Sequence, residues 1–278
     1  MKSKIIGDSC CDLNKKLKEE LKIEIVPLTI NVDGYTLVDD ENLDIEKLLH
    51  LMKNSPVAPK TACPSPGDYM KAFEEGDNIF VVTLSSNLSG SYNSALLAQN
   101  MMKEKSLHKF IHIFDSLSAS IGQTLVSIKL HELIGQKYEN IAIVEKINQY
   151  IKEMKTFFIL ESLDNLIKAG RLSKLKGKIA TALNIKPIMG EDGAGNIRQV
   201  ENVRSSKKAF HRLVEIIGEQ GEKFEEKILG IAHCNALEKA KKLKEEIGKR
   251  YPFKDIIIVE TAGISTVYAN DGGIIIAF

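Results

Sequence analysis

The chain has 278 residues, with 38 lysines and arginines against 37 aspartates and glutamates, giving a formal net charge of +1. That length can bury the cores of two ordinary domains, and the charge balance gives no electrostatic reason to expect nucleic acid or an anionic membrane as partner. The partner is therefore expected to be a small molecule or another protein.

The N-terminal residues MKSKIIGDSCCDL lead into a short strand-like run, and no apolar stretch there is long enough for a signal peptide or a membrane span. The four cysteines include an adjacent pair and form no C-x-x-C, which argues against a zinc cage or a disulfide framework. They are Cys10, Cys11, Cys63 and Cys234. We expect a cytoplasmic protein with reduced thiols and no integral membrane segment.

Short β-branched runs alternate with longer helical patterns in the first half of the chain, where KIIG, NIFVVTL and FIHIFD each precede a helical segment. This alternation is typical of βαβ units and predicts a doubly wound parallel sheet. Residues PLTINVDGYTLV interrupt it with period-two alternation around Asp33-Gly34, which predicts a small β-hairpin insertion. The segment NSPVAPKTACPSPG holds four of the seven prolines and is predicted to form a shaped loop.

The pattern changes near residue 154. TFFIL, KILGIAH, DIIIVE and DGGIIIAF have the composition of strands, and LNIKPIMGEDGAGNIRQVENV predicts a hairpin around residues 193–196. Two further segments, SSKKAFHRLVEIIGE and NALEKAKKLKEEIGKR, predict helices. We therefore expect an N-terminal α/β domain over residues 1–154 and a C-terminal α+β domain with a mixed or antiparallel sheet over residues 155–278.

Polar residues follow three of the strand-like runs in the first half: Asp8-Ser9, Asp115-Ser116 and the serine-rich residues 85–91. In a doubly wound sheet these ends meet at one edge, where ligands bind. A Ser/Gly turn that opens a helix also offers backbone N–H groups to an anion. Each segment alone is more typical of a helix cap, but together they favour a shared cleft.

Familiar catalytic motifs are missing, since the sequence contains no G-x-S-x-G, P-loop, H-E-x-x-H or strand-linked G-x-G-x-x-G. GEDGAGN joins two strand-like runs, which favours a hairpin turn over a phosphate loop. His108 and His112 are expected to be ordinary strand histidines in preference to metal ligands. His233 ends a strand-like run, and two roles stay open for its side chain: it lines the cleft, or it packs in the core.

A basic cluster in KAGRLSKLKGK has two interpretations. It is either a solvated face or a docking or phosphate-guiding patch, because the planar fork of arginine suits phosphate. Its members are Lys168, Arg171, Lys174, Lys176 and Lys178.

Taken together, these segments resemble the DegV family of fatty-acid-binding proteins, which includes the acyl-binding subunit of bacterial fatty acid kinase. The resemblance covers nearly the whole chain. It is carried by DSCCDL, the pair Pro27-Leu28, KTACPSP, SSNLSGSYNSA, DSLSASIGQ, LDNLIKAGRLS, IKPIM, VRSSKKA and the terminal glycine-rich strand. It implies two α/β domains with a long-chain fatty acid buried between them, its carboxylate held by hydroxyls.

The resemblance also implies roles for individual residues. Thr61 of TACP matches the family threonine that bonds the carboxylate, Ser89 of LSG matches the second donor, and Gly90 matches its neighbouring backbone contact. Arg171 of KAGR and Arg204 of VRSSKK match positive positions associated with the head-group opening and kinase docking.

Two positions depart from the family pattern. The family usually has T-S-x-P where this chain has Ala62 and Cys63, a change expected to alter one polar contact. Many members end in His-x-Gly-Pro-Gly, whose histidine completes the carboxylate site, whereas Tyr268 of YANDGG stands there in this chain. A neutral phenol donates one hydrogen bond without positive charge, so the change bears on kinase coupling more than on acyl binding.

The sequence therefore predicts a protein with no catalytic residues, metal or cofactor that binds a long-chain fatty acid and presents its carboxylate to a separate ATP-dependent kinase. Two alternatives stay open: a small-molecule hydrolase or phosphotransferase using Ser89 or Asp8 in the interdomain cleft, which needs a positioned base, and a sensor of non-acyl carboxylates. The expected carboxylate-binding residues are Thr61, Ser89, Gly90 and Tyr268, and the expected phosphate-guiding residues are Arg171 and Arg204.

Overall fold

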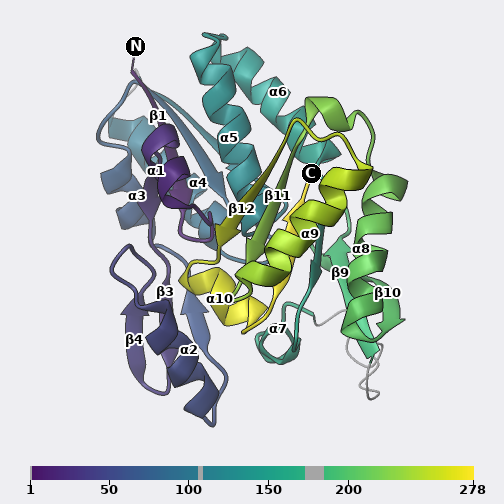
Figure 1. Cartoon of the computed structure of the whole chain (residues 1–278). Helices are drawn as coiled ribbons and strands as arrows, with labels where there is room; N and C mark the ends of the chain where they lie inside the picture. The colour runs from purple at the N-terminus through teal and green to yellow at the C-terminus, as the bar shows by residue number, and fades with distance from the viewer. Residues whose placement is uncertain (1, 106–108, 173–184) are drawn as a thin grey trace.

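The computed structural model describes residues 2–105, 109–172 and 185–278, which form three β-sheets and the helices that cover them (Figure 1). A four-stranded sheet has the order β2-β1-β6-β7, a three-stranded sheet the order β4-β3-β5, and a six-stranded sheet the order β10-β9-β8-β13-β11-β12. The predicted mixture of a parallel sheet, a small β insertion and a second, mixed sheet is confirmed.

The four-stranded sheet is parallel throughout, so its strands end at one edge. The central strand β6 is buried along its whole length, which explains its unbroken apolar sequence. Its strands are β1 (Ser3–Asp8), β2 (Glu24–Val26), β6 (Asn78–Thr83) and β7 (Phe110–Asp115), and the helices between and beside them are α1 (Lys15–Leu21), α3 (Pro66–Ala72), α4 (Ser91–Lys105), α5 (Ile121–Gly135) and α6 (Asn140–Glu153).

The three-stranded sheet is the predicted insertion. β3 (Thr29–Val32) and β4 (Tyr35–Val38) form a hairpin whose turn residues both have positive φ, 50° at Asp33 and 85° at Gly34, as a type I′ turn requires. The proline-rich segment is not wholly loop, because it includes the edge strand β5 (Lys60–Ala62), which pairs with β3. Helix α2 (Ile45–Asn54) lies between the hairpin and β5 in the chain.

In the six-stranded sheet, β11 and β12 pair parallel and the other described neighbours pair antiparallel. The predicted hairpin around residues 193–196 is the β9–β10 connection. Its strands are β8 (Thr156–Ile159), β9 (Ile185–Glu191), β10 (Ile197–Arg204), β11 (Ile228–His233), β12 (Asp255–Glu260) and β13 (Ile274–Ala277), with α7 (Asp164–Lys168), α8 (Ser206–Gln220), the 3-10 turn η2 (Phe224–Glu226), α9 (Leu237–Arg250) and α10 (Gly263–Ala269).

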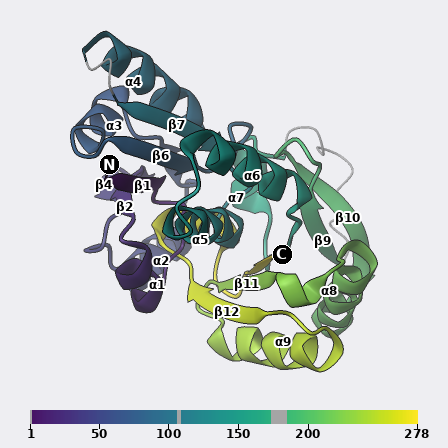
Figure 2. The ribbon, with the colours of Figure 1, turned by 90° about the horizontal axis from the view of Figure 1, so that it is seen from above.

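Helix α5 lies between the two large sheets, as the view from above shows (Figure 2). It touches β1 and β6 on one side and β11 and β13 on the other, and most of its residues are buried, including the polar Gln123, Thr124 and Ser127. One apolar cluster, including Phe80, Leu125, Phe158 and Ile275, therefore crosses the predicted domain boundary, which falls just before β8.

Within the described ranges, every helix is too short or too polar to cross a membrane. All four cysteines are free, with Cys63 exposed and the other three buried.

Candidate functional site

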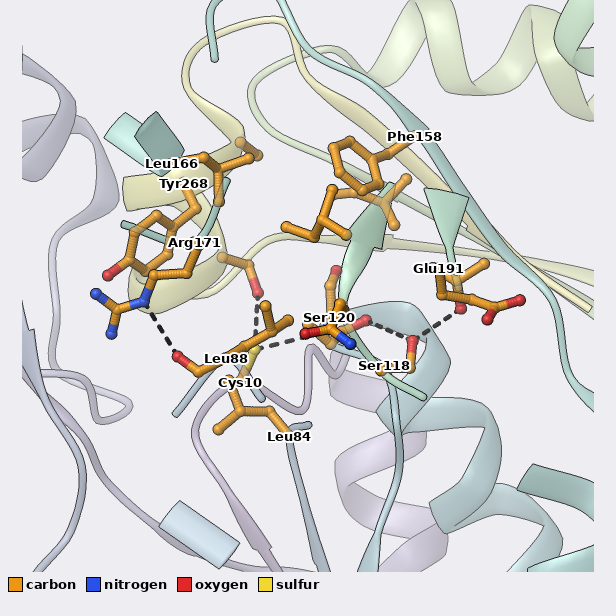
Figure 3. A pocket seen from close by; sticks show the side chains of 18 of the residues that line it. Cys10, Leu84, Leu88, Ser118, Ser120, Phe158, Leu166, Arg171, Glu191 and Tyr268 are labelled. Atoms are coloured by element: carbon orange, nitrogen blue, oxygen red, sulfur yellow. Dashed lines mark hydrogen bonds between the residues drawn. The ribbon is translucent and has the colours of Figure 1, made fainter. Parts of the chain in front are cut away.

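An apolar cavity lies where the carboxyl edge of the parallel sheet faces the mixed sheet, with an empty volume of about 800 Å³, its opening included (Figure 3). Leu84 and Leu88 follow β6, Phe158 belongs to β8, and Ile275 belongs to β13, so both halves of the chain supply its walls. Helix α10 adds Ile264, Ser265, Tyr268 and Ala269.

One end of the cavity is polar. The Nε of Arg171 donates to the carbonyl oxygen of Leu88 at 3.1 Å, and the guanidinium lies 5.6 Å from the ring centroid of Tyr268, within the range of a cation–π contact. The Tyr268 hydroxyl is hydrogen-bonded to the Thr61 hydroxyl at 2.8 Å. Three predicted site residues, Thr61, Arg171 and Tyr268, are thus brought together, although Thr61 and Tyr268 are 207 positions apart.

Ser89 and Gly90 lie beside this end, on the turn that joins Leu88 to α4. The Ser89 hydroxyl accepts a hydrogen bond from the Ser91 amide at 3.2 Å. A Cβ built on Gly90 would lie 3.1 Å from the Sγ of Cys63, so the turn packs closely against the TACP segment. The described cavity wall does not include Ser89, Gly90 or Thr61, which lie next to it.

Arg204 is separate from this group. It is the exposed last residue of the edge strand β10, where it pairs with Ile185, and it is not among the described wall residues. The neighbouring Lys186 forms an ion pair with Glu161 just after β8, so Arg204 lies at the end of the mixed sheet that leads to α7. Of the predicted basic cluster, Lys174, Lys176 and Lys178 lie outside the described residues.

The strand ends of the parallel sheet meet as predicted, but Asp8 serves the fold there. Its fully buried carboxylate accepts from the amides of Leu84 and Cys10 and from the side chains of Ser91 and Gln123, at 2.6 to 3.2 Å. Burial raises its pKa, against the opposing effect of these bonds. Ser91 and Ser94 at the start of α4 are therefore structural, because the Ser91 hydroxyl donates to Asp8 and the Ser94 hydroxyl donates to the Pro64 carbonyl.

Several wall residues carry hydroxyl or thiol groups that were not singled out from the sequence. Ser118 and Thr156 are hydrogen-bonded to each other at 2.8 Å, and the Sγ of Cys10 lies 3.8 Å from the Ser265 hydroxyl. Burial raises the pKa of the Cys10 thiol well above its usual value, so it stays neutral. Ser118 belongs to the motif DSLSASIGQ, but nothing in the sequence marked Thr156 or Ser265, because their partners are distant in the chain.

The tip of the β9–β10 hairpin closes one side of the cavity. Ser85 donates to the Gly195 carbonyl at 2.8 Å, and the Asn87 side chain donates to the Ala194 carbonyl at 2.7 Å. Gly195 has φ of 81°, and a Cβ there would clash with the Ser85 hydroxyl. The serine-rich turn therefore contacts the C-terminal half of the chain directly, which the sequence did not predict.

None of the described histidines lines the cavity. His233 is buried, and its Nδ1 accepts from the Ala236 amide at 3.3 Å, so of the two open interpretations the core contact holds. His112 is half-buried on β7 beside Phe114, and burial lowers its pKa. His108 lies outside the described residues. The described part of the chain contains no cluster of three potential metal ligands.

Comparisons with known proteins cover the whole chain. The family described as "Uncharacterised protein, DegV family" matches residues 2–278. A DegV domain-containing protein of Streptococcus pneumoniae is 37% identical over 277 residues, covering 99% of this chain and 98% of the relative.

Solved structures of related proteins also match this chain over nearly its full length. A DegV family protein from Ruminococcus gnavus, refined with vaccenic acid, is 42% identical with a TM-score of 0.96, covering 100% of this chain and 99% of that one. The fatty acid kinase (Fak) B3 protein of Streptococcus pneumoniae, loaded with linoleic acid, is 36% identical with a TM-score of 0.91 and the same coverage. A Eubacterium eligens member loaded with heptadecanoic acid is 29% identical with a TM-score of 0.91, covering 99% of each chain. Fatty-acid binding thus recurs among proteins built like this one, and the chain itself belongs to the DegV family.

Proposed function

We propose that this chain binds one long-chain fatty acid, with the tail along the apolar walls and the carboxylate at the end formed by Thr61, Tyr268 and Arg171. The observation that carries the proposal is the combination of an apolar cavity with hydroxyl and guanidinium groups at one end. The three fatty-acid-bound relatives support it, because their similarity extends over the full length.

The tail supplies most of the affinity. A sixteen-carbon chain has about 14 methylenes, and burying each contributes about 0.8 kcal/mol, or about 11 kcal/mol before the cost of ordering the ligand. A hydrogen bond to a charged carboxylate contributes about 1.5 to 3 kcal/mol. The apolar walls therefore set the affinity, and the polar end sets where the carboxylate lies.

Several hydrogen-bond donors are proposed to hold the head group. In the pair formed by Thr61 and Tyr268, one hydroxyl proton is used in their mutual hydrogen bond, which leaves the other proton for the carboxylate. The Ser89 hydroxyl accepts from the Ser91 amide and keeps its own proton for an acceptor. The Gly90 amide follows on the same turn. These four residues are the proposed carboxylate clamp, with Arg171 as the adjacent positive charge.

The chain is further proposed to present this carboxylate to a separate ATP-dependent kinase in the cytoplasm, which forms an acyl phosphate, and to carry out no chemistry itself. The relative named as a fatty acid kinase B3 protein supports this role, and the sequence has no P-loop to bind ATP on its own. Positive charge stabilises a developing acyl phosphate, which is the role proposed for Arg171 and Arg204.

The enzymatic alternative is less well supported. Asp8 is fully buried and occupied by four hydrogen bonds. Within the described residues, the hydrogen-bond partner of the Ser89 hydroxyl is the Ser91 amide, which is no base. A nucleophile needs a positioned base within hydrogen-bond reach.

Mass spectrometry of organic extracts from the purified protein tests the proposal. We expect about one long-chain fatty acid per chain, and after delipidation the protein should take up added oleate to the same ratio. Protein that is both lipid-free and unable to take up oleate would contradict it. Incubation of loaded protein with ATP and the kinase of the same organism then tests presentation, since it should yield acyl phosphate only when both proteins are present.

A further inference from the structure

Helix α10 carries Tyr268 into the proposed carboxylate clamp, yet its own sequence does not anchor its first turn. Its N-cap is Ala262, which has no side-chain acceptor for the free amides of the first turn. Those amides are bound from the other half of the chain. The Asp39 carboxylate accepts from the amides of Gly263 at 2.7 Å and Ile264 at 2.9 Å.

Asp39 is built into this position. It is 3% exposed, follows directly after β4, and also receives a hydrogen bond from the Ser9 side chain. A carboxylate that bonds two amides at a helix start gains from charge-assisted hydrogen bonds and from the helix dipole. A Cβ on Gly263 would lie 2.5 Å from the Asp39 Oδ1 and would clash with Leu43, so only glycine allows this approach.

The sheet that supplies Asp39 also supplies Thr61. Thr61 lies on β5, opposite Ile30 of β3, and bonds Tyr268 near the other end of α10. The small sheet therefore holds α10 at two points, its first turn and Tyr268. Between them, Ile30 packs in one apolar cluster with Ile264 and Val267 of the helix.

We propose that Asp39 is a positioning residue for the carboxylate clamp: by fixing the first turn of α10 against the small sheet, it sets the Tyr268 hydroxyl opposite Thr61. This inference rests on the proposed fatty-acid binding and names a residue that is not itself among the described wall residues, although it bonds the amide of the wall residue Ile264. If Asp39 were a helix cap that only stabilised the fold, replacing it would not change the position of the ligand carboxylate.

The test is Asp39→Asn, which keeps the shape but turns one acceptor into an amide that faces a backbone N–H. Binding is measured with oleate by competition, and the head group is followed by the carbon-13 resonance of carboxyl-labelled oleate. We expect about three- to tenfold weaker binding, the range for one ordinary hydrogen bond, and a shifted carboxyl resonance. In a Tyr268→Phe background, Asp39→Asn should cause no further weakening, because the two residues act through one hydroxyl.

Asp44→Ala is the matched control. Asp44 caps α2 in the same insertion through the Lys47 amide at 2.9 Å, and no described hydrogen bond joins it to α10. Because α2 also packs against α10, this variant tests whether loss of any helix cap in the insertion moves the head group. It should lower thermal stability without moving the carboxyl resonance.

Two results would overturn the inference while leaving fatty-acid binding intact. In the first, the effects of Asp39→Asn and Tyr268→Phe on binding add in full; in the second, Asp39→Asn does not shift the carboxyl resonance. If the parent takes up no oleate, the proposed function itself fails. Should Asp39→Asn not fold, Ser9→Ala removes one donor from Asp39 and takes its place in the same double-mutant cycle, where full additivity or an unmoved resonance again overturns the inference.

Discussion

The two arginines assigned a common role from the sequence have different surroundings in the structure. Arg171 bonds the Leu88 carbonyl and covers the Tyr268 ring, so it is part of the proposed head-group end. Arg204 is exposed at a strand end outside the described wall. Their contributions to binding and to transfer are therefore expected to separate.

Arg204→Ala should leave bound fatty acid unchanged and lower acyl-phosphate formation with the kinase. Arg171→Ala should lower both, with binding weakened by about 1 kcal/mol, because the positive charge beside the carboxylate and the support of the Tyr268 ring are lost together. Bound lipid is quantified by mass spectrometry beside the coupled phosphorylation assay. Loss of lipid from Arg204→Ala, or full retention of affinity by Arg171→Ala, would contradict this separation.

Asp12 gives the stability of the protein a predictable dependence on pH. It is fully buried, accepts from the Ser120 hydroxyl at 2.5 Å and the Ala262 amide at 2.7 Å, and burial raises its pKa from 3.8 to about 7. Between about pH 4 and pH 7 the folded chain thus binds this proton more tightly than the unfolded chain. The free energy of unfolding must fall as pH rises through that window.

Asp12→Asn should remove this part of the slope, which is at most about 1.4 kcal/mol per pH unit for one proton. Urea unfolding at several pH values from about 4.5 to 7 measures it. The raised pKa values of Asp8 and Asp39 add slope of the same sign in both proteins, so the difference between parent and variant isolates Asp12. An unchanged slope would show that Asp12 stays ionised across the window.

At the scale of elements, the local sequence was enough to predict the two hairpins. It was not enough to predict which residues the hairpins contact. Asp33-Gly34 and the glycines near residue 195 specify tight turns through positive φ, and both turns form. The same residues say nothing about the bond from Ser85 to Gly195, which depends on how the two halves pack. Asp39 was missed for the same reason, since Gly263 is 224 positions away.

The hairpin tip should control how fast the ligand leaves. Asn87→Ala removes one of the two side-chain bonds that hold the tip over the cavity, at a cost of about 1 kcal/mol, so we expect a severalfold faster dissociation of fatty acid by stopped-flow fluorescence. Asn31→Ala serves as control, because Asn31 bonds Thr36 across the other hairpin. Equal rates in the two variants would exclude the tip from the exit path.

At the scale of the molecule, the two large sheets share the helix between them. Because α5 buries one side on each sheet, neither half completes its core alone. The predicted domains 1–154 and 155–278 are therefore expected to unfold together.

Calorimetry of the delipidated protein should show one transition with equal calorimetric and van't Hoff enthalpies. Leu125→Ala, at a 1% exposed position of α5, should lower the free energy of unfolding by about 2 to 5 kcal/mol while keeping the single transition. Two resolved transitions would instead show independent domains on either side of residue 154.

The position of Cys63 has a practical consequence. Of the four thiols it alone is exposed, and it lies against Gly90 in the turn that borders the proposed head-group end. A maleimide fluorophore should therefore label the unaltered chain at one site, beside the place where a carboxylate would arrive. The natural protein then serves as its own optical reporter, with the emission of the dye expected to change as oleate is titrated in and to stay constant in a denatured, labelled control.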